Sequence, residues 1–492
     1  MLFTSTVFSF LFLPIVAVGF FALGRTPRAA AAWLGMASLF FYGYWAPQYV
    51  LLLLGSIVVN YLAGVTIGRF RDSGRDRAAH AALLLGLIFN LGLLGWFKYA
   101  DFLIGTLRTV TGMDLPVLGV LLPIGISFFT FTQIAFLVDT WKKGTREYRF
   151  IHYLLFVTYF PHLIAGPVLH HAQMMPQFAD PAIYRPQAAS IGAGLVMFAI
   201  GLFKKIVLAD GIAPYADTVF DGVAAGSMAT PLEAWIGALA YTLQLYFDFS
   251  GYSDMAVGLS MIFGVRLPFN FDSPYRAANI SQFWRSWHMT LSAFLRDYLY
   301  IAMGGNRRGP NRRIFNLMAT MLLGGLWHGA AWTFVVWGGL HGLFLVIHHQ
   351  WGASATAAAR RIMPAPIVTA LAWLLTMFAV VVAWVFFRAA SFDAAGSVLM
   401  SMFSPWRSDG VAAMLFNAGL SQGRGMVLIG SLSLIALLPW NSNRLFDALL
   451  AAARRIPGLA WASVGFGLVI SGALVVVSEL RTSTSPFIYF NF

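Results

Sequence analysis

The 492-residue chain contains no cysteine and few charged residues. The absence of cysteine excludes disulfides, thiolate nucleophiles and cysteine zinc sites. Only 10% of the residues are Asp, Glu, Lys or Arg, whereas a soluble domain carries roughly 25%. This shortage of charge excludes an ordinary soluble enzyme and a disordered scaffold. The sequence also has no P-loop, serine elbow or Rossmann glycine pattern in a suitable context, which argues against an ATPase, a serine hydrolase and a dinucleotide-binding enzyme.

Hydrophobic residues make up 59% of the chain, and the mean hydropathy is +0.73. Several apolar runs are long enough to cross about 30 Å of hydrocarbon, which predicts an all-α polytopic membrane protein. The first run, residues 2–24, has no Lys or Arg before it and is followed by Arg25 and Arg28. We expect it to be an uncleaved span with its N-terminus outside, since a signal peptide would have a basic start and a shorter apolar core.

Further apolar runs predict a total of about 11 to 13 transmembrane and re-entrant helices. The expected spans are 29–45, 48–68, 78–97, 117–140, 190–209, 315–332, 333–350, 366–387, 425–440 and 459–480. Proline and glycine interrupt the segments that start at Ile151 and Pro231. Irregular backbone at membrane depth survives only beside protein or a water-lined cavity, so we expect an internal chamber. No internal repeat is present, and residues 1–492 are interpreted as a single domain.

The chain carries 32 Lys plus Arg against 19 Asp plus Glu, a net charge of +13. Most of this excess is explained by the tendency of positive residues to stay in cytoplasmic loops. The basic loops 69–77, 142–149 and 307–313 are therefore predicted to be cytoplasmic. Where these cations cluster, they are also available to an anionic cytosolic substrate.

Two carboxylates, Asp248 and Asp254, interrupt an otherwise apolar stretch. Buried carboxylates need partners, and we expect ion pairs with arginines further along the chain; a direct contact with substrate is the alternative.

Residues 281–302 are predicted to form one amphipathic helix, with Asn279 or Ser281 as its cap. One stripe of this helix would hold Arg285, His288, Ser292 and Arg296. The helix either lies at the membrane surface with snorkelling arginines, or forms a cytosolic rim that receives a phosphorylated ligand.

His328 lies in a nearly uncharged segment, beside small residues and tryptophans. An imidazole in hydrocarbon is costly unless it has a partner, so His328 is a functional candidate; a neutral histidine that bridges two helices is the alternative. The ten histidines form no metal motif, since His341 and His348 are separated by about 10 Å of helix rise. A transporter and a scaffold without turnover stay open as other functional classes.

Several strings in the chain resemble the membrane-bound O-acyltransferase family, and within it the bacterial branch that O-acetylates alginate. The resemblance extends from about Asn90 to the closing string PFIYFNF (486–492). The strings are PIGISFFTF (123–131), FPHLIAGP (160–167), YFDFSGYSDM (246–255), FNFDSPY (269–275), FWRSWH (283–288), YLYI (298–301) with GGNR (304–307), and GGLWHG (324–329).

The resemblance implies a ring of transmembrane helices around a central tunnel, in which His328 is the essential histidine and His288 the second one. It also implies cytosolic acetyl-CoA as the acyl donor, no bound cofactor, and transfer of the acetyl group to a periplasmic polysaccharide acetyltransferase partner. The expected product is an O-acetylated exported polysaccharide such as alginate, made at the cell inner membrane, with export of D-alanyl or other acyl groups as the alternative. No nucleic-acid partner is expected.

The composition agrees with direct acyl transfer from a thioester to a hydroxyl, because neither a cysteine nor a serine elbow is available. Such a transfer requires a general base, and a neutral imidazole supplies one near neutral pH. We assign this role to His328, and we expect His288 to orient the thioester or stabilise oxyanion charge. Arg285, Arg296, Arg307 and Arg308 are the candidate partners for the phosphates of the donor.

Overall fold

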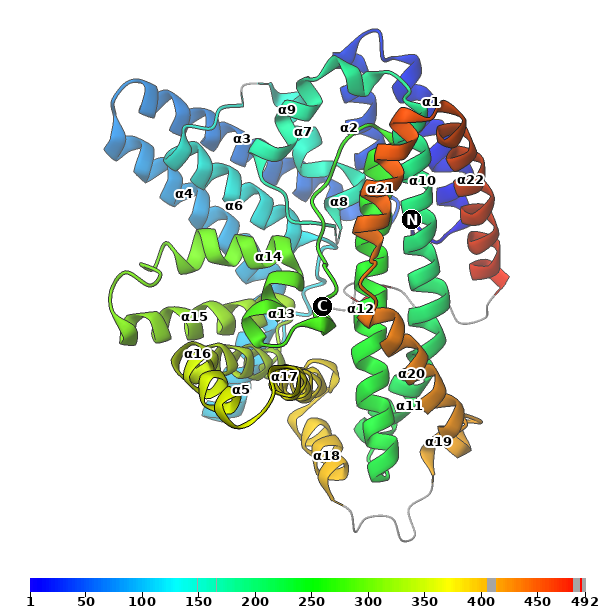
Figure 1. Ribbon diagram of the computed structural model, residues 1–492. Helices are drawn as coiled ribbons and strands as arrows, with labels where there is room; N and C mark the ends of the chain where they lie inside the picture. The colour runs from blue at the N-terminus through cyan, green and yellow to red at the C-terminus, as the bar shows by residue number, and fades with distance from the viewer. Residues whose placement is uncertain (148, 165, 405–412, 481–486, 489–492) are drawn as a thin grey trace. The chain divides into compact units, whose positions relative to one another are not determined.

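The computed structural model describes residues 1–492 except 148, 165, 405–412, 481–486 and 489–492 (Figure 1). This described part is helical and contains no strand, which confirms the predicted all-α class. The string 160–167 lies in the described part except for residue 165, and only Phe487 and Ile488 of the closing string 486–492 are described.

The chain divides into two compact units. Unit 1 comprises Met1–Leu202, Tyr252–Phe269 and Arg444–Thr484, and unit 2 comprises Phe203–Gly251, Asn270–Asn443 and Ser485–Phe492. The expectation of a single functional domain stays a prediction.

The helices of unit 1 come mainly from the first two hundred residues. They are η1 (Val7–Phe12), α1 (Leu13–Ala22), α2 (Pro27–Gly43), η2 (Pro47–Tyr49), α3 (Val50–Asp72), α4 (Asp76–Leu94), η3 (Gly95–Tyr99), α5 (Ala100–Thr111), α6 (Ile126–Lys143), α7 (Phe150–Thr158), α8 (Phe160–Leu163), α9 (His171–Ala179), η4 (Pro181–Tyr184), α10 (Ala188–Phe203), the end of α12 (Pro231–Ile262), most of α21 (Ser442–Arg455), and α22 (Pro457–Leu480).

The helices of unit 2 hold most of the candidate site. Besides most of α12, they are η5 (Lys204–Ala209), α11 (Asp210–Ala224), η6 (Pro274–Arg276), α13 (Ile280–Ser286), α14 (Met289–Phe294), η7 (Leu295–Tyr300), α15 (Pro310–His328), α16 (Trp332–Ile362), α17 (Ala365–Arg388), α18 (Phe392–Phe403), α19 (Met414–Asn417) and α20 (Gln422–Leu437).

Five helical segments of the described chain are long and apolar enough to cross a membrane, or six if Gln422–Leu437 and Ser442–Arg455 form one broken span. The five are Pro47–Asp72, Asp76–Thr111, Ala188–Ala224, Ala365–Arg388 and Pro457–Leu480. The shorter apolar helix Val7–Ala22 lies within the predicted run 2–24, whereas the second short apolar helix, Phe392–Phe403, was not predicted. The chain is thus a multi-pass membrane protein, while the total of about 11 to 13 spans stays a prediction.

Several expected helix boundaries were wrong, and two of them bear on the candidate site and its surroundings. The helix expected from residue 117 begins only at Ile126, because the preceding segment is not helical and both Gly119 and Gly125 have a positive φ (64° and 73°). The turn expected between residues 332 and 333 lies instead between His328 and Trp332, where Gly329 leaves the helical conformation with φ −165° and ψ 149°. His328 is therefore the last residue of a helix rather than an interior one.

The hairpin of α15 and α16 is closely packed at its glycines. A Cβ atom on Gly325 would overlap the carbonyl oxygen of Phe334, and one on Gly338 would overlap that of Met321. The two backbones can approach this closely only because neither position carries a side chain, as at other small-residue contacts between membrane helices. This contact fixes the end of α15, where His328 lies.

Candidate functional site

Two buried histidines of unit 2 lie next to each other although they are forty residues apart in the sequence. His288 lies between α13 and α14, and His328 ends α15; these three helices are labelled in Figure 1. Their ring centroids are 6.4 Å apart, and the residues are only 1% and 3% exposed. The structure thus brings together the two residues that the sequence analysis assigned to the catalytic step.

The helix expected over 281–302 is broken at His288, so that prediction was wrong. Asn279 caps α13 as expected, by accepting a hydrogen bond from the Gln282 N–H at 2.9 Å. The helix ends at Ser286, because Trp287 has an extended backbone (φ −102°, ψ 127°), and His288 then adopts the left-handed conformation with φ 42° and ψ 54°. As a consequence the predicted stripe does not exist: His288 is buried, whereas Arg285 and Arg296 are exposed.

The break at His288 is held by Asn270, which precedes η6 in the irregular segment before α13. The Met289 N–H donates to the Asn270 carbonyl oxygen at 2.9 Å, and the Thr290 hydroxyl donates to Asn270 Oδ1 at 2.6 Å. These bonds satisfy the start of α14 and direct the His288 ring inward.

Aromatic rings from three helices enclose His328. The ring centroids of Trp327 and Trp337 each lie 5.0 Å from that of His328, and Phe387 of α17 lies at 5.3 Å. Since His328 is in the last turn of α15, the negative end of the helix dipole stabilises positive charge on its ring. The position suits a group that accepts a proton during a reaction.

The His288 ring has aromatic neighbours of its own and shares Trp327 with His328. Phe249 of α12 approaches it edge-on at 4.7 Å, and Trp327 lies 5.9 Å away, between the two histidines. Phe487, from the closing string of the sequence, packs in turn on Phe249 at 5.7 Å. The two imidazoles therefore share one apolar enclosure built from distant parts of unit 2.

A third buried histidine, His341 of α16, completes this cluster. Its ring lies 4.8 Å from that of Trp337, and its Nδ1 accepts a hydrogen bond from Trp284 Nε1 at 3.3 Å. The sequence analysis considered His341 only as half of a metal pair and missed its position here. The available signal was its spacing, because residues 337 and 341 lie four apart on one apolar helix face.

The buried carboxylate Asp248 pairs with a lysine, so the expected arginine partner was wrong. Lys205 Nζ lies 2.7 Å from Asp248 Oδ1 and 2.8 Å from Asp210 Oδ1, and all three side chains are almost completely buried. Asp248 Oδ2 also accepts the Ile488 N–H at 3.0 Å. Lys205 belongs to the π-helical segment η5, which turns it inward. Asp254, which is also buried, belongs to unit 1.

The four candidate donor-binding arginines are in different surroundings. Arg285 lies within electrostatic reach of His348 and His349 on α16, and Arg313 reaches His349 as well. Arg296 is hydrogen-bonded to Asp297 at 2.7 Å, which raises the pKa of its guanidinium. Arg307 and Arg308 lie in the turn before α15. Of these four arginines, Arg285 is the one within electrostatic reach of the C-terminal half of α16, through His348 and His349.

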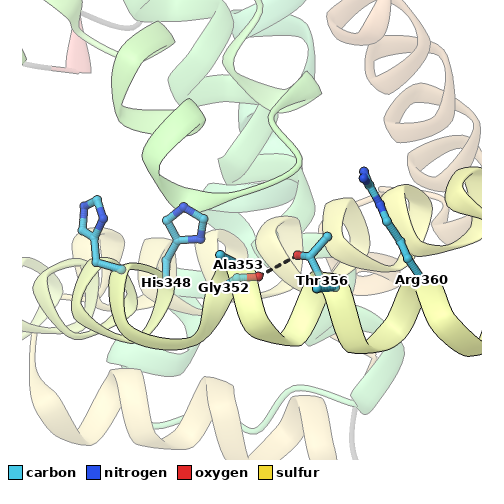
Figure 2. A pocket seen from close by; sticks show the side chains of 7 residues that line it. His348, Gly352, Ala353, Thr356 and Arg360 are labelled. Atoms are coloured by element: carbon cyan, nitrogen blue, oxygen red, sulfur yellow. Dashed lines mark hydrogen bonds between the residues drawn. The ribbon is translucent and has the colours of Figure 1, made fainter.

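That end of α16 carries a pocket of about 520 Å³ (Figure 2). It is lined by His348, His349, Gly352, Ala353, Thr356, Ala357 and Arg360. His348 and Arg360 project from the same side of the helix in Figure 2, while Gly352 and Ala353 leave room between them. Arg285 and Arg313 do not line the pocket but lie within electrostatic reach of its residue His349, so groups that can bind an anion lie in the pocket and near it.

No group of three or more His, Asp or Glu side chains suited to a metal ion occurs among the residues that the structure describes. The described cluster places three imidazoles, those of His288, His328 and His341, among aromatic rings.

Comparison with known proteins matches a model of the membrane-bound O-acyltransferase family to residues 119–391. This span contains His288, His328 and His341.

The chain is also similar to three curated proteins. It is 43% identical over 430 residues to a peptidoglycan O-acetyltransferase of Helicobacter pylori, with 82% of this chain and 80% of the relative covered. It is 43% identical over 410 residues to a probable alginate O-acetylase AlgI of Pseudomonas aeruginosa, with 82% and 75% covered. The corresponding Pseudomonas putida protein is 39% identical over 516 aligned positions, with 100% of both chains covered.

Proposed function

Because the chain belongs to the membrane-bound O-acyltransferase family, we propose that it moves an acetyl group from cytosolic acetyl-CoA for O-acetylation of an exported polysaccharide such as alginate. As a member of this family the chain is an acyltransferase, and the relatives compared above are named for O-acetylation. The observation that carries the proposal is the pair of buried histidines, whose ring centroids lie 6.4 Å apart inside one aromatic enclosure.

In this proposal His328 is the general base. It takes the proton from the acceptor hydroxyl as that oxygen attacks the thioester carbonyl carbon. The new C–O bond forms, the C–S bond breaks, and the proton passes from the imidazole to the departing thiolate. The end of the α15 dipole stabilises the imidazolium that exists in between, and His288 orients the thioester or stabilises its developing negative charge.

The test of this function is a substitution of the proposed base. His328→Ala should lower acetyl-CoA turnover by about 100-fold to 10,000-fold, the usual contribution of a general base. Thiol release from acetyl-CoA by purified protein measures it without background, because the chain contains no cysteine. The O-acetyl content of the exported polysaccharide in cells gives a second readout.

The matched control is His80→Ala, the same change at an exposed histidine of α4, which should leave turnover near the wild-type value. Normal turnover by folded His328→Ala protein would reject the assignment and favour a transporter or a scaffold.

The donor is proposed to place its phosphates on the cations beside the α16 pocket. Arg285, Arg313, His348 and Arg360 gather there from three helices, and Arg296, Arg307 and Arg308 extend the same basic surface by sequence. Since the cations are solvent-accessible, each contact to phosphate contributes less than the 1.5 to 3 kcal/mol of a buried charge-assisted bond.

Removal of two of these cations should therefore weaken donor binding without stopping the chemistry. Arg285→Ala with Arg313→Ala should raise the KM for acetyl-CoA about tenfold or more and leave kcat nearly unchanged, and we expect the same direction for Arg307→Ala with Arg308→Ala. Arg454→Ala with Arg455→Ala, in the last turn of α21, removes the same charge elsewhere and is the control. If all three double variants have the same KM, the phosphates bind at another place.

We further propose an inner-membrane location with the N-terminus outside and a periplasmic acetyltransferase partner that receives the acetyl group. The alternation of basic loops along the sequence supports this orientation.

A further inference from the structure

His341 of α16 is fixed in one neutral form by its neighbour Trp284. The residue is completely buried, and its Nδ1 accepts the Trp284 indole N–H at 3.3 Å. An indole nitrogen can only donate, so Nδ1 must carry a lone pair and the neutral ring must carry its proton on Nε2. Phe283 stacks on the same ring at 5.9 Å with an interplanar angle of 15°, which holds its orientation.

The Nε2–H of His341 finds no hydrogen-bond acceptor among the residues that the structure describes. The indole N–H of Trp337 is in the same position: it is fully buried and has no acceptor within the described chain. A buried donor that is left unsatisfied lowers the stability of the fold, because it has lost its hydrogen bond to water without replacement. Two such donors in one cluster therefore require a reason, because buried polar groups are nearly always satisfied.

The two donors lie on one face of α16 and beside the proposed base. Residues 337 and 341 are four apart, so their side chains project from adjacent turns of the same face. The Trp337 ring lies 4.8 Å from that of His341 and 5.0 Å from that of His328. A small ligand in contact with His328 would therefore lie close to the Trp337 ring, which in turn packs against His341.

We propose that Trp337 Nε1–H and His341 Nε2–H form a binding site for a carbonyl oxygen of the acyl donor, next to His328. A carbonyl oxygen has two lone pairs and can accept from both donors. An indole and a neutral imidazole carry no net charge, which matches an uncharged carbonyl rather than a phosphate or a carboxylate. This inference rests on the proposed function for the identity of the donor. It goes further by naming two residues that contact the donor, Trp337 and His341, and the carbonyl group as the part that they bind.

The test uses two unreactive analogues of the donor that differ in the carbonyl group. Acetonyl-CoA carries a ketone and cannot transfer an acetyl group, while S-propyl-CoA has the same chain length and no carbonyl. Wild-type protein should bind acetonyl-CoA about tenfold more tightly than S-propyl-CoA, as measured by titration calorimetry on the full chain in nanodiscs.

The diagnostic variant is Trp284→Phe combined with His341→Phe. It keeps two aromatic rings and removes both partners of the 3.3 Å hydrogen bond together with the unsatisfied Nε2–H, so that it creates no new orphaned donor. Its thermal stability should equal or exceed that of the wild type. It should lose most of the preference for acetonyl-CoA, and kcat/KM for acetyl-CoA should fall about tenfold. Trp337→Phe should reduce the same preference.

Equal affinity of wild type for the two analogues, or failure to bind either one, would overturn the inference. The inference would also be overturned if the double variant kept the wild-type preference for acetonyl-CoA, or if its melting temperature fell enough to account for the lost activity. The proposed function fails in a different way, through absence of turnover or through normal turnover by His328→Ala. Carbonyl-dependent binding without turnover would therefore retain this site and reject only the reaction.

Discussion

At the scale of single residues, the backbone of His288 is the least expected feature of the cluster. Apart from glycines, the described residues with a positive φ are Ser273 and His288, at 47° and 42°. The left-handed conformation costs a residue with a side chain about 1 to 2 kcal/mol relative to its right-handed form, and glycine avoids this cost. A side chain kept at such a position, buried and facing a second histidine, indicates that the ring has a role that glycine cannot supply.

A pair of substitutions separates the ring of His288 from its backbone. His288→Gly and His288→Ala both remove the imidazole, so both should reduce turnover, although less than His328→Ala does. The alanine variant should be about 1 kcal/mol less stable than the glycine variant, because only alanine is strained at this φ. Thermal unfolding and thiol release on the purified variants measure the two effects. An alanine variant as stable as the glycine variant would show that the left-handed conformation is not retained.

At the scale of elements, the α15 and α16 hairpin determines where the proposed base and the carbonyl site lie. Its glycines allow backbone-to-backbone contact at Gly325 and Gly338. His328 and His341 are then held by the two arms of one hairpin, and α17 adds Phe387 against His328. Any change that separates the two arms should therefore reduce activity as well as stability.

Adjacent glycines of α16 provide a matched test of this contact. A Cβ at Gly338 would overlap the Met321 carbonyl oxygen, whereas one at Gly339 would lie in ordinary contact, 3.4 Å from a Leu322 methyl carbon. We expect Gly338→Ala to lower the melting temperature by several degrees and turnover by at least tenfold. Gly339→Ala should be neutral or slightly stabilising, since alanine favours the helix by about 1 kcal/mol. Equal effects of the two substitutions would contradict close packing of the hairpin.

At the scale of the whole molecule, the distribution of charge along the chain sets the expected orientation in the membrane. The net charge is +13, and positive residues are concentrated at 69–77, 142–149 and 307–313. Positive segments are retained in the cytoplasm during insertion. The segment between Thr111 and Ile126 contains a single charge, Asp114, and should lie on the opposite side.

Because the natural chain has no cysteine, single cysteines report this orientation directly. Ser73→Cys, Lys142→Cys and Asn311→Cys should resist a membrane-impermeant maleimide in intact spheroplasts and react once the membrane is opened. Asp114→Cys, whose side chain is 96% exposed in the structure, should react in both conditions. Reaction of any of the first three in intact spheroplasts would overturn the proposed orientation.

The sequence alone determined the membrane class, the all-α fold and the family, and it predicted the two site histidines, because long apolar runs, scarce charge and short local strings are properties of consecutive residues. Helix ends were less accessible: the break at His288 depends on Asn270, which is distant from it in the chain, and the buried partner of Asp248 is Lys205 rather than an arginine. Only the tertiary structure brought Trp284 of α13 against His341 of α16 and left the His341 Nε2–H without an acceptor in the described chain. Such relations arise when helices pack, and no periodicity within a single helix encodes them.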